Sequence, residues 1–180
     1  MNEDAGASAA ARATSTRPRL DPGADDRMAP HFVYVLALLF TPDTRGVVLV
    51  RKTRPAWQVG RVNALGGKLL PGESAATAAS REVEEEAGVQ VPPDAWREIA
   101  VWRDPVYRMH VLAALHAAAG RARTAEDQEV FLADVRDLPR EAIENLRWLI
   151  PLALDRDVAL PVELRSANPE GSGLTESPPA

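Results

Sequence analysis

Blocks of apolar residues separated by turn residues run through the middle of the chain and predict a series of strands. The first block, residues 32–40, holds nine apolar side chains in a row and is typical of a strand buried on both faces. Pro42, Asp43 and Gly46 mark the turn after it, and residues 47–50 are predicted as the returning strand of a hairpin. Further strands are predicted over residues 99–102, 108–115 and 129–134.

Two segments have the composition and spacing of helices. Residues 74–87 are rich in alanine and glutamate, and Gly88 suits the left-handed position that ends many helices. Residues 139–153 predict a closing helix, or a helix pair broken near Pro151. Strands on both sides of one helix, followed by a closing helix, indicate the α/β class with a mixed sheet covered on both faces.

The two ends of the chain differ in composition from this central part. Residues 1–29 carry almost no large apolar side chain, and the chain from about Ser166 is rich in proline and glycine. Such segments cannot bury enough surface to offset the entropy lost on ordering. We therefore expect a disordered N-terminal tail over 1–29, a folded domain over 30–160 and a disordered C-terminal tail over 161–180. Within the domain, the turn-rich segment 51–67 is predicted to be a long functional loop.

Composition and charge narrow the kinds of partner. With 21 basic and 26 acidic side chains the chain has a formal net charge of −5, which disfavours binding to a nucleic-acid polymer. The absence of cysteine excludes disulfides, thiolate zinc sites and cysteine nucleophiles. The nine-residue apolar run is about half the length of a membrane-spanning helix, and no signal peptide precedes Asp25. We expect a cytoplasmic protein that does not bind membranes.

The first predicted helix carries an unusual set of carboxylates. Glu82, Glu85 and Glu86 project within roughly a third of its circumference and lie in its last turns, where like charges and the helix dipole both disfavour glutamate. A divalent cation such as Mg²⁺ or Mn²⁺ would compensate this charge, because both ions prefer carboxylate oxygens. A solvated acidic face is the alternative explanation. Gly66 and Gly67 lie in a tight loop just before the helix, where backbone groups can approach a metal or a phosphate.

The segment from Gly67 to Val89 resembles the Nudix box. It contains glycine, five residues, Glu73, seven residues and then Arg-Glu-Val-Glu-Glu-Glu-Ala-Gly-Val, so that every fixed position of the box is matched. The resemblance implies the Nudix fold, an α/β/α sandwich with a mixed β-sheet, and hydrolysis of a diphosphate linkage in a nucleotide. It also implies Mg²⁺ as the cofactor, with Mn²⁺ as an alternative, held by these ligands: Glu82, Glu85, Glu86 and the carbonyl of Gly66.

Other acidic and basic residues receive roles from the same resemblance. Arg81 would pair with a box glutamate and hold it in position, and Glu73 would orient the loop and the helix. Glu85 is the first choice within the box for the base that takes a proton from the attacking water. Glu126 and Glu129 are candidates from a later loop, as a base or as a further metal ligand. An exposed acidic turn is the alternative explanation for both.

The segment before the box bears on the substrate. Residues 54–68 resemble the corresponding segment of MutT-type members, which remove damaged nucleoside triphosphates. On this resemblance Asn63 would contact the base and Lys68 would reach a substrate phosphate. Trp57 would stack on the base. A turn-capping role for Asn63 and simple packing of Trp57 are the alternatives.

The leading expectation is hydrolysis of a nucleoside triphosphate, including oxidised ones such as 8-oxo-dGTP, to the monophosphate and pyrophosphate. Two residues favour other substrates. Pro105 resembles a proline of ADP-ribose-cleaving members, and Tyr107 resembles a tyrosine of members that cleave diadenosine polyphosphates. A Nudix module that senses nucleotides without hydrolysis is a further alternative, disfavoured because no box glutamate is lost. A homodimer is left open.

Overall fold

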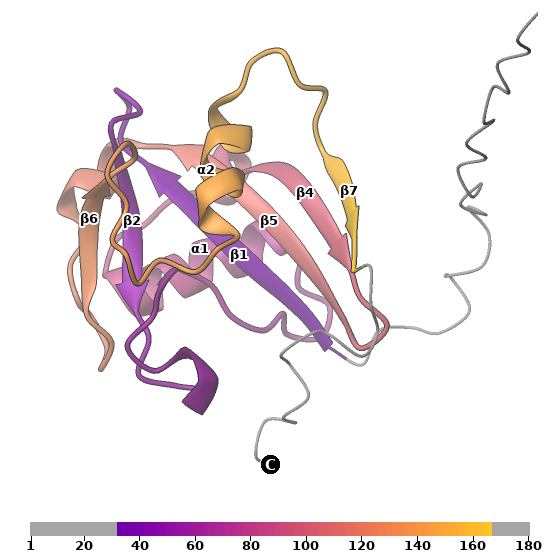
Figure 1. The fold of residues 1–180 in the computed structure, drawn as a ribbon, viewed down its shortest axis with the longest axis horizontal. Coiled ribbons are helices and arrows are strands. Elements are labelled where there is room, and N and C mark those ends of the chain that lie inside the picture. The colour runs from indigo at the N-terminus through magenta and orange to yellow at the C-terminus, as the bar shows by residue number, and fades with distance from the viewer. Residues whose placement is uncertain (1–31, 167–180) are drawn as a thin grey trace, which may run out of the picture.

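The computed structural model describes residues 32–166, and the elements are drawn in Figure 1. The tail predicted over 1–29 lies outside the described residues, as does residue 167 onward of the other predicted tail. The described strands are β1 (Phe32–Phe40), β2 (Gly46–Arg51), β3 (Val62–Ala64), β4 (Arg97–Arg103), β5 (Tyr107–Leu115), β6 (Val130–Asp134) and β7 (Val162–Arg165). The helices are α1 (Ala75–Ala87) and α2 (Leu146–Leu154), with short 3₁₀ turns at Ala56–Gln58, Pro93–Ala95 and Ala117–Arg121.

The strands form one sheet in the order β3-β2-β1-β5-β4-β7, and β6 also pairs with β2. β1 runs parallel to β5, and β4 runs parallel to β7. The remaining strand pairs are antiparallel. The sheet is therefore mixed, as the sequence predicts.

The apolar run of β1 is continuous because the strand is buried on both faces. Val35 and Leu39 belong to a core that includes Val83 of α1. Leu38, on the opposite face, belongs to a second core that includes Leu149 of α2. Figure 1 shows the two helices on opposite faces of the sheet. The predicted α/β/α sandwich is confirmed.

The predicted hairpin of β1 and β2 is present, but the two strands pair only next to their turn, where Phe40 lies opposite Val47. Farther from the turn, β1 bonds to the chain that follows β3. The amide of Ala37 donates to the carbonyl of Leu65 (2.8 Å), and the amide of Val35 donates to the carbonyl of Gly67 (2.9 Å). The segment that opens the box is therefore held in extended form against the central strand.

The prediction of a loop over residues 51–67 was wrong in part. β3 lies within it and pairs with β2, with Leu49 opposite Ala64. The polar Asn63 at the centre of a three-residue strand hides the apolar pattern that marks longer strands. The pairing with β2 supplies what the local sequence does not.

The closing helix is shorter than predicted. Residues 139–145 are not helical, because their backbone bonds to β3 instead: the amide of Val62 donates to the carbonyl of Glu141, and the amide of Ile143 donates to the carbonyl of Val62, both at 2.9 Å. Pro151 lies inside α2 and does not end it, contrary to the prediction. It lies in the second turn and costs the helix a single backbone hydrogen bond.

The expected start of the C-terminal tail at residue 161 was also wrong. β7 lies within that tail and pairs with β4, with Ala100 opposite Val162. Val162 and Leu164 pack against the core on the α2 side, while Glu163 is exposed apart from an ion pair with Arg103 (3.3 Å). The strand forms because the edge of β4 offers backbone partners that the local sequence does not reveal.

None of the helices within residues 32–166 has the length and the hydrophobicity that a membrane span requires.

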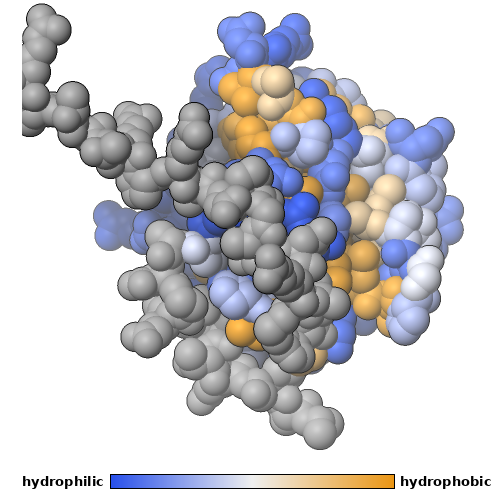
Figure 2. Space-filling view, turned by 90° about the vertical axis from the view of Figure 1, so that its right-hand side faces the viewer, coloured by the Kyte–Doolittle hydropathy of each residue, from blue (hydrophilic) through white to orange (hydrophobic). Residues whose placement is uncertain are grey.

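Figure 2 shows the face at the β7 edge of the sheet. On the described residues of that face, apolar side chains gather in patches that hydrophilic residues separate. These separated patches do not define a dimer interface, and the homodimer stays a prediction.

Candidate active site

α1 presents the box carboxylates, and both of its ends are fixed by capping. The hydroxyl of Ser74 accepts a hydrogen bond from the amide of Thr77 (3.1 Å), and Gly88 ends the helix in the left-handed conformation with φ 62°. Val83 and several alanines of one face are fully buried, so the helix lies close against the sheet. Beside this face lie the three carboxylates of the predicted metal site: Glu82, Glu85 and Glu86.

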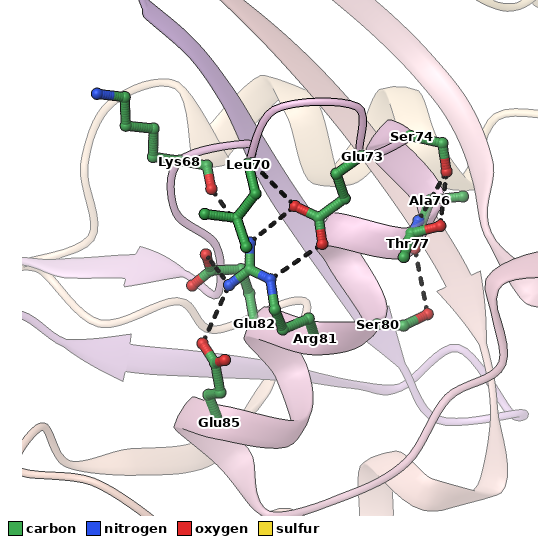
Figure 3. Close-up of polar contacts among 10 residues, drawn as sticks. All are labelled: Lys68, Leu70, Glu73, Ser74, Ala76, Thr77, Ser80, Arg81, Glu82 and Glu85. Atoms are coloured by element: carbon green, nitrogen blue, oxygen red, sulfur yellow. Dashed lines mark hydrogen bonds and ion pairs between the residues drawn. The ribbon is translucent and has the colours of Figure 1, made fainter.

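The Arg81 guanidinium connects these carboxylates to the loop before the helix (Figure 3). Its Nε and Nη2 donate to the two oxygens of Glu73, each at 3.0 Å, in a bidentate pair. Its Nη1 donates to Glu82 Oε1 (2.8 Å) and Glu85 Oε2 (3.1 Å). Nη2 also donates to the carbonyl of Lys68 (3.1 Å). Arg81 thus pairs with box glutamates, and Glu73 links loop and helix, as the resemblance implies.

Burial and charge shift the pKa values of these carboxyl groups in opposite directions. Burial raises the pKa of Glu82, although Arg81 opposes the shift. Hydrogen bonds from Arg81 lower the pKa of Glu73, which also accepts from the amide of Leu70 (3.0 Å). An additional cation beside Glu82 would therefore stabilise the charged form that burial disfavours.

Two glycines bring backbone and carboxylates together. A Cβ on Gly66, whose φ is 139°, would lie 2.2 Å from the carbonyl oxygen of Val35. A Cβ on Gly67 would lie 2.4 Å from Glu82 Oε1. The amide of Gly66 donates to Glu86 Oε2 (2.9 Å). Only glycine fits at position 66, and the Glu82 carboxylate lies directly against the backbone of Gly67.

Lys52 is a member of the site that the sequence analysis missed. It follows β2 directly, and its Nζ lies 3.1 Å from Glu86 Oε1. The pair is buried, with side-chain exposures of 12% for Lys52 and 7% for Glu86. The available signal was its rarity, because only two of the 21 basic residues are lysine and this one directly follows a strand of apolar residues.

Lys68, the other lysine, does not reach the carboxylates in this structure. Its ammonium points away from them in Figure 3 and lies 4.7 Å from the centre of the Phe32 ring. The backbone carbonyl of Lys68 is the group that joins the network, through Arg81. The phosphate contact assigned to Lys68 stays a prediction.

The donor set fits a hard divalent cation by chemistry and charge, although it is not assembled around one. Within residues 32–166, no three His, Asp or Glu side chains converge in an arrangement ready to hold a metal ion. Four carboxylates face two cationic side chains instead, which leaves a formal charge equal and opposite to that of one Mg²⁺. The members are Glu73, Glu82, Glu85, Glu86, Arg81 and Lys52.

Of the predicted base-contacting residues, Trp57 lies between β2 and β3, and Asn63 lies in β3. Asn63 is nearly buried, and its amide group is engaged locally: Oδ1 accepts from the amide of Ala64 (2.8 Å) and Nδ2 donates to Gln58 Oε1 (3.3 Å). Trp57 lies in the 3₁₀ turn that projects at the bottom of Figure 1, with 38% of its surface exposed. Trp57 is thus open to a ligand, while the side-chain amide of Asn63 is occupied by neighbours within the protein.

The later acidic loop packs beside the end of β2. Glu129 pairs with Arg51 (2.8 Å), and Asp127 pairs with Arg54 (2.6 Å). Glu126 is exposed. The loop therefore neighbours Lys52, while Glu129 is already engaged by a surface cation.

The comparisons with known proteins agree with this arrangement. The family model of the NUDIX domain matches residues 30–157. The chain belongs to the NUDIX domain family. No curated protein matches the chain.

Solved structures similar to this Nudix hydrolase include enzymes of different names. A MutT NUDIX hydrolase from Burkholderia pseudomallei is 25% identical over 69% of this chain and 98% of its own, with a TM-score of 0.57. A MutT structure from work on Aliivibrio salmonicida and Vibrio cholerae is 21% identical over 67% and 96% of the two chains, with a TM-score of 0.53. An ADP-ribose pyrophosphatase from Streptococcus suis is 18% identical over 74% and 98%, with a TM-score of 0.56. The last two are similar in fold alone.

The two residues that favour other substrates occupy different environments in this Nudix hydrolase. Pro105 is exposed in the turn between β4 and β5. Tyr107 is buried, packs edge-on against Tyr34 with ring centres 6.4 Å apart, and has a pKa raised by burial and by the nearby Asp104. Packing accounts for Tyr107 without a ligand.

Proposed function

We propose that this Nudix hydrolase is a Mg²⁺-dependent pyrophosphohydrolase of nucleoside triphosphates. It converts them, oxidised ones such as 8-oxo-dGTP among them, to the nucleoside monophosphate and pyrophosphate. The observation that carries the proposal is the cluster formed by α1 and the loop before it, where four carboxylates exceed their cationic partners by two charges beside the Gly66–Gly67 backbone. Metal-bound polyphosphate is the ligand whose charge and oxygen chemistry complement such a cluster.

The side chains divide the work as follows. Glu82, Glu85 and Glu86, with the carbonyl of Gly66, would hold Mg²⁺, or Mn²⁺ in its place. The bound metal would neutralise phosphoryl oxygens and lower the pKa of a water molecule. Arg81 fixes α1 to the loop through its bidentate pair with Glu73 and keeps the carboxylates in register.

Glu85 is the best-placed group to take the proton of the attacking water. Its side chain is 48% exposed, compared with 13% for Glu82 and 7% for Glu86, so solvent and substrate reach it most readily. Glu129 is a weaker candidate, because it pairs with Arg51 and lies in the later loop rather than among the carboxylates joined by Arg81. Attack on a phosphorus atom then breaks the diphosphate linkage, and the proton remains on Glu85 until solvent removes it.

The choice of triphosphates rests on the segment before the box. Residues 54–68 resemble MutT-type members, and a MutT enzyme is 25% identical to this chain. We assign base stacking to Trp57, whose ring is open to solvent, and base contact to Asn63, which requires Nδ2 to leave Gln58. We further propose that the enzyme acts in the cytoplasm on small nucleotides rather than on nucleic-acid polymers, since its net charge is −5.

A panel of nucleotides tests this assignment. The purified protein is incubated in Mg²⁺ with normal and oxidised triphosphates, ADP-ribose and diadenosine polyphosphates, and the products are separated by ion-exchange chromatography. Glu85→Gln should abolish turnover. Glu84→Gln is the matched control, because Glu84 lies on the same helix and bonds to Gln90 outside the cluster (2.8 Å).

Monophosphate and pyrophosphate from triphosphates, lost in Glu85→Gln and kept in Glu84→Gln, would support the proposal. A preference for ADP-ribose or a dinucleotide would refute the substrate class and keep the hydrolase. No turnover of any compound would refute catalysis on these substrates and favour the sensing module.

A further inference from the structure

The buried ion pair of Lys52 and Glu86 lies where a metal ligand is expected. Both oxygens of Glu86 are engaged: Oε1 accepts from Lys52 Nζ at 3.1 Å, and Oε2 accepts from the amide of Gly66 at 2.9 Å. A backbone amide and a cation can share one carboxylate, because each oxygen has two lone pairs. Two cations on the same carboxylate repel each other strongly where water is largely excluded.

The lysine is positioned by its backbone. The amide of Lys52 donates to the carbonyl of Arg61 (2.8 Å), and its carbonyl accepts from the amide of Gly60 (2.9 Å). These backbone bonds hold the Cα of Lys52 beside the cluster and leave its side chain free to change rotamer. An ammonium displaced from Glu86 remains within the reach of its four-carbon stem and needs a new anionic partner.

We propose that Lys52 is the counter-ion of Glu86 in the metal-free protein, that a divalent cation displaces it, and that the polyphosphate of the substrate then binds the released ammonium. The inference rests on the metal-dependent function proposed above. It makes the metal and the nucleotide bind cooperatively. The metal alone must leave a largely buried ammonium without a partner, whereas the metal together with a polyphosphate satisfies both charges.

Selective acetylation of wild-type protein tests the displacement without any variant. The chain has only two lysines, so peptide mass spectrometry after a brief pulse of acetic anhydride at fixed pH follows both side chains separately. Without metal, Lys52 should react at least about tenfold more slowly than Lys68, because it is buried and ion-paired. Saturating Mn²⁺ should raise the Lys52 rate several-fold, and Mn²⁺ with a methylene-bridged, non-hydrolysable dGTP analogue should lower it again.

Binding of Mn²⁺, measured by the electron paramagnetic resonance signal of the free ion, tests the cooperativity. In Lys52→Met, the Kd for Mn²⁺ alone should fall about tenfold, because Glu86 no longer has a competing cation. The factor by which the dGTP analogue tightens Mn²⁺ binding should shrink by at least about tenfold. Lys52→Arg keeps the charge and should stay close to wild type on both measures.

Lys68→Met is the matched control, since it removes the same charge from an ammonium that lies over Phe32 and outside the cluster. Its Kd for Mn²⁺ alone should stay within twofold of wild type. An equal effect of Lys68→Met and Lys52→Met on the Kd for Mn²⁺ alone, or a Lys52 acetylation rate that does not respond to bound Mn²⁺, would overturn the inference. If the enzyme hydrolyses triphosphates but the Lys52 acetylation rate does not respond to Mn²⁺, the inference is overturned and the proposed function stands. A responsive Lys52 without hydrolysis would overturn only the proposed function, and failure to bind Mn²⁺ would overturn both.

Discussion

Replacing Gly67 by alanine should separate the geometry of the site from the stability of the fold. The added Cβ would lie 2.4 Å from Glu82 Oε1 and 2.5 Å from its Cδ, whereas ordinary contacts begin at 3.4 Å. The carboxylate, which accepts from Arg81 Nη1 at 2.8 Å, must therefore retreat from the new Cβ by about 1 Å. The atoms that move are the end of a flexible side chain, so the backbone is not forced to shift.

The expected magnitude follows from this displacement. A misplacement of about 1 Å in a catalytic arrangement costs on the order of 100-fold in rate. We expect kcat/KM for a triphosphate in Mg²⁺ to fall about 100-fold, or about 2.7 kcal/mol of transition-state stabilisation. The free energy of unfolding of Gly67→Ala should stay within about 1 kcal/mol of wild type, since only a side chain rearranges.

Two other glycines provide the controls. Gly72 has φ 80° and open space around its Cα, so Gly72→Ala should cost about 1–2 kcal/mol of stability through backbone strain and leave kcat/KM nearly unchanged. Gly66→Ala meets the backbone oxygen of Val35 at 2.2 Å and should fail to fold. Steady-state kinetics and urea denaturation of the variants check both quantities. Wild-type activity in Gly67→Ala, or an equal loss of activity in Gly72→Ala, would refute the reasoning.

Three further outcomes are expected. Because Arg81 lowers the pKa of Glu73 below its ordinary 4.5, the pair adds stability that is present above pH 4.5 and lost as the pH falls below it. Thermal melts from pH 3 to 7 should show that Glu73→Gln is less stable than wild type at pH 7 and close to it at pH 3. A stability difference that is independent of pH would contradict this. Trp57→Ala should raise KM about tenfold with kcat unchanged if the ring stacks on the base, and steady-state kinetics with unchanged KM would exclude stacking. EDTA should abolish hydrolysis, and Mg²⁺ or Mn²⁺ should restore it, as a product assay will show.

The parts of the fold that the sequence predicted are those determined by local pattern. α1 begins and ends within one residue of its prediction, because Ser74 and Gly88 are capping residues and the alanine-rich face has a helical period. β1 was predicted as doubly buried because its apolar residues do not alternate with polar ones. The pairing of Arg81 with box glutamates follows from the motif, since its partners lie within eight residues of it.

The parts that were missed depend on partners distant in sequence. β7 exists because it pairs with β4 some 60 residues earlier, and β3 exists because β2 and residues 139–145 lie on either side of it. Lys52 reaches Glu86 across 34 residues, and no periodicity within either segment records that contact. The contact of the Lys68 ammonium with the Phe32 ring likewise joins two residues that are distant in sequence.

The cations of the site explain how α1 forms without a metal. Three glutamates near the C-terminal end of a helix repel one another and oppose its dipole, at a cost of a few tenths of a kcal/mol for each pair and more where water is excluded. Arg81 and Lys52 offset that cost, and in doing so they occupy oxygens that a metal would need. The two cations therefore stabilise the metal-free helix and, at the same time, lower the affinity of the site for the free metal. A substrate that brings its own negative charge restores the balance, because its phosphates receive the cation that the metal releases.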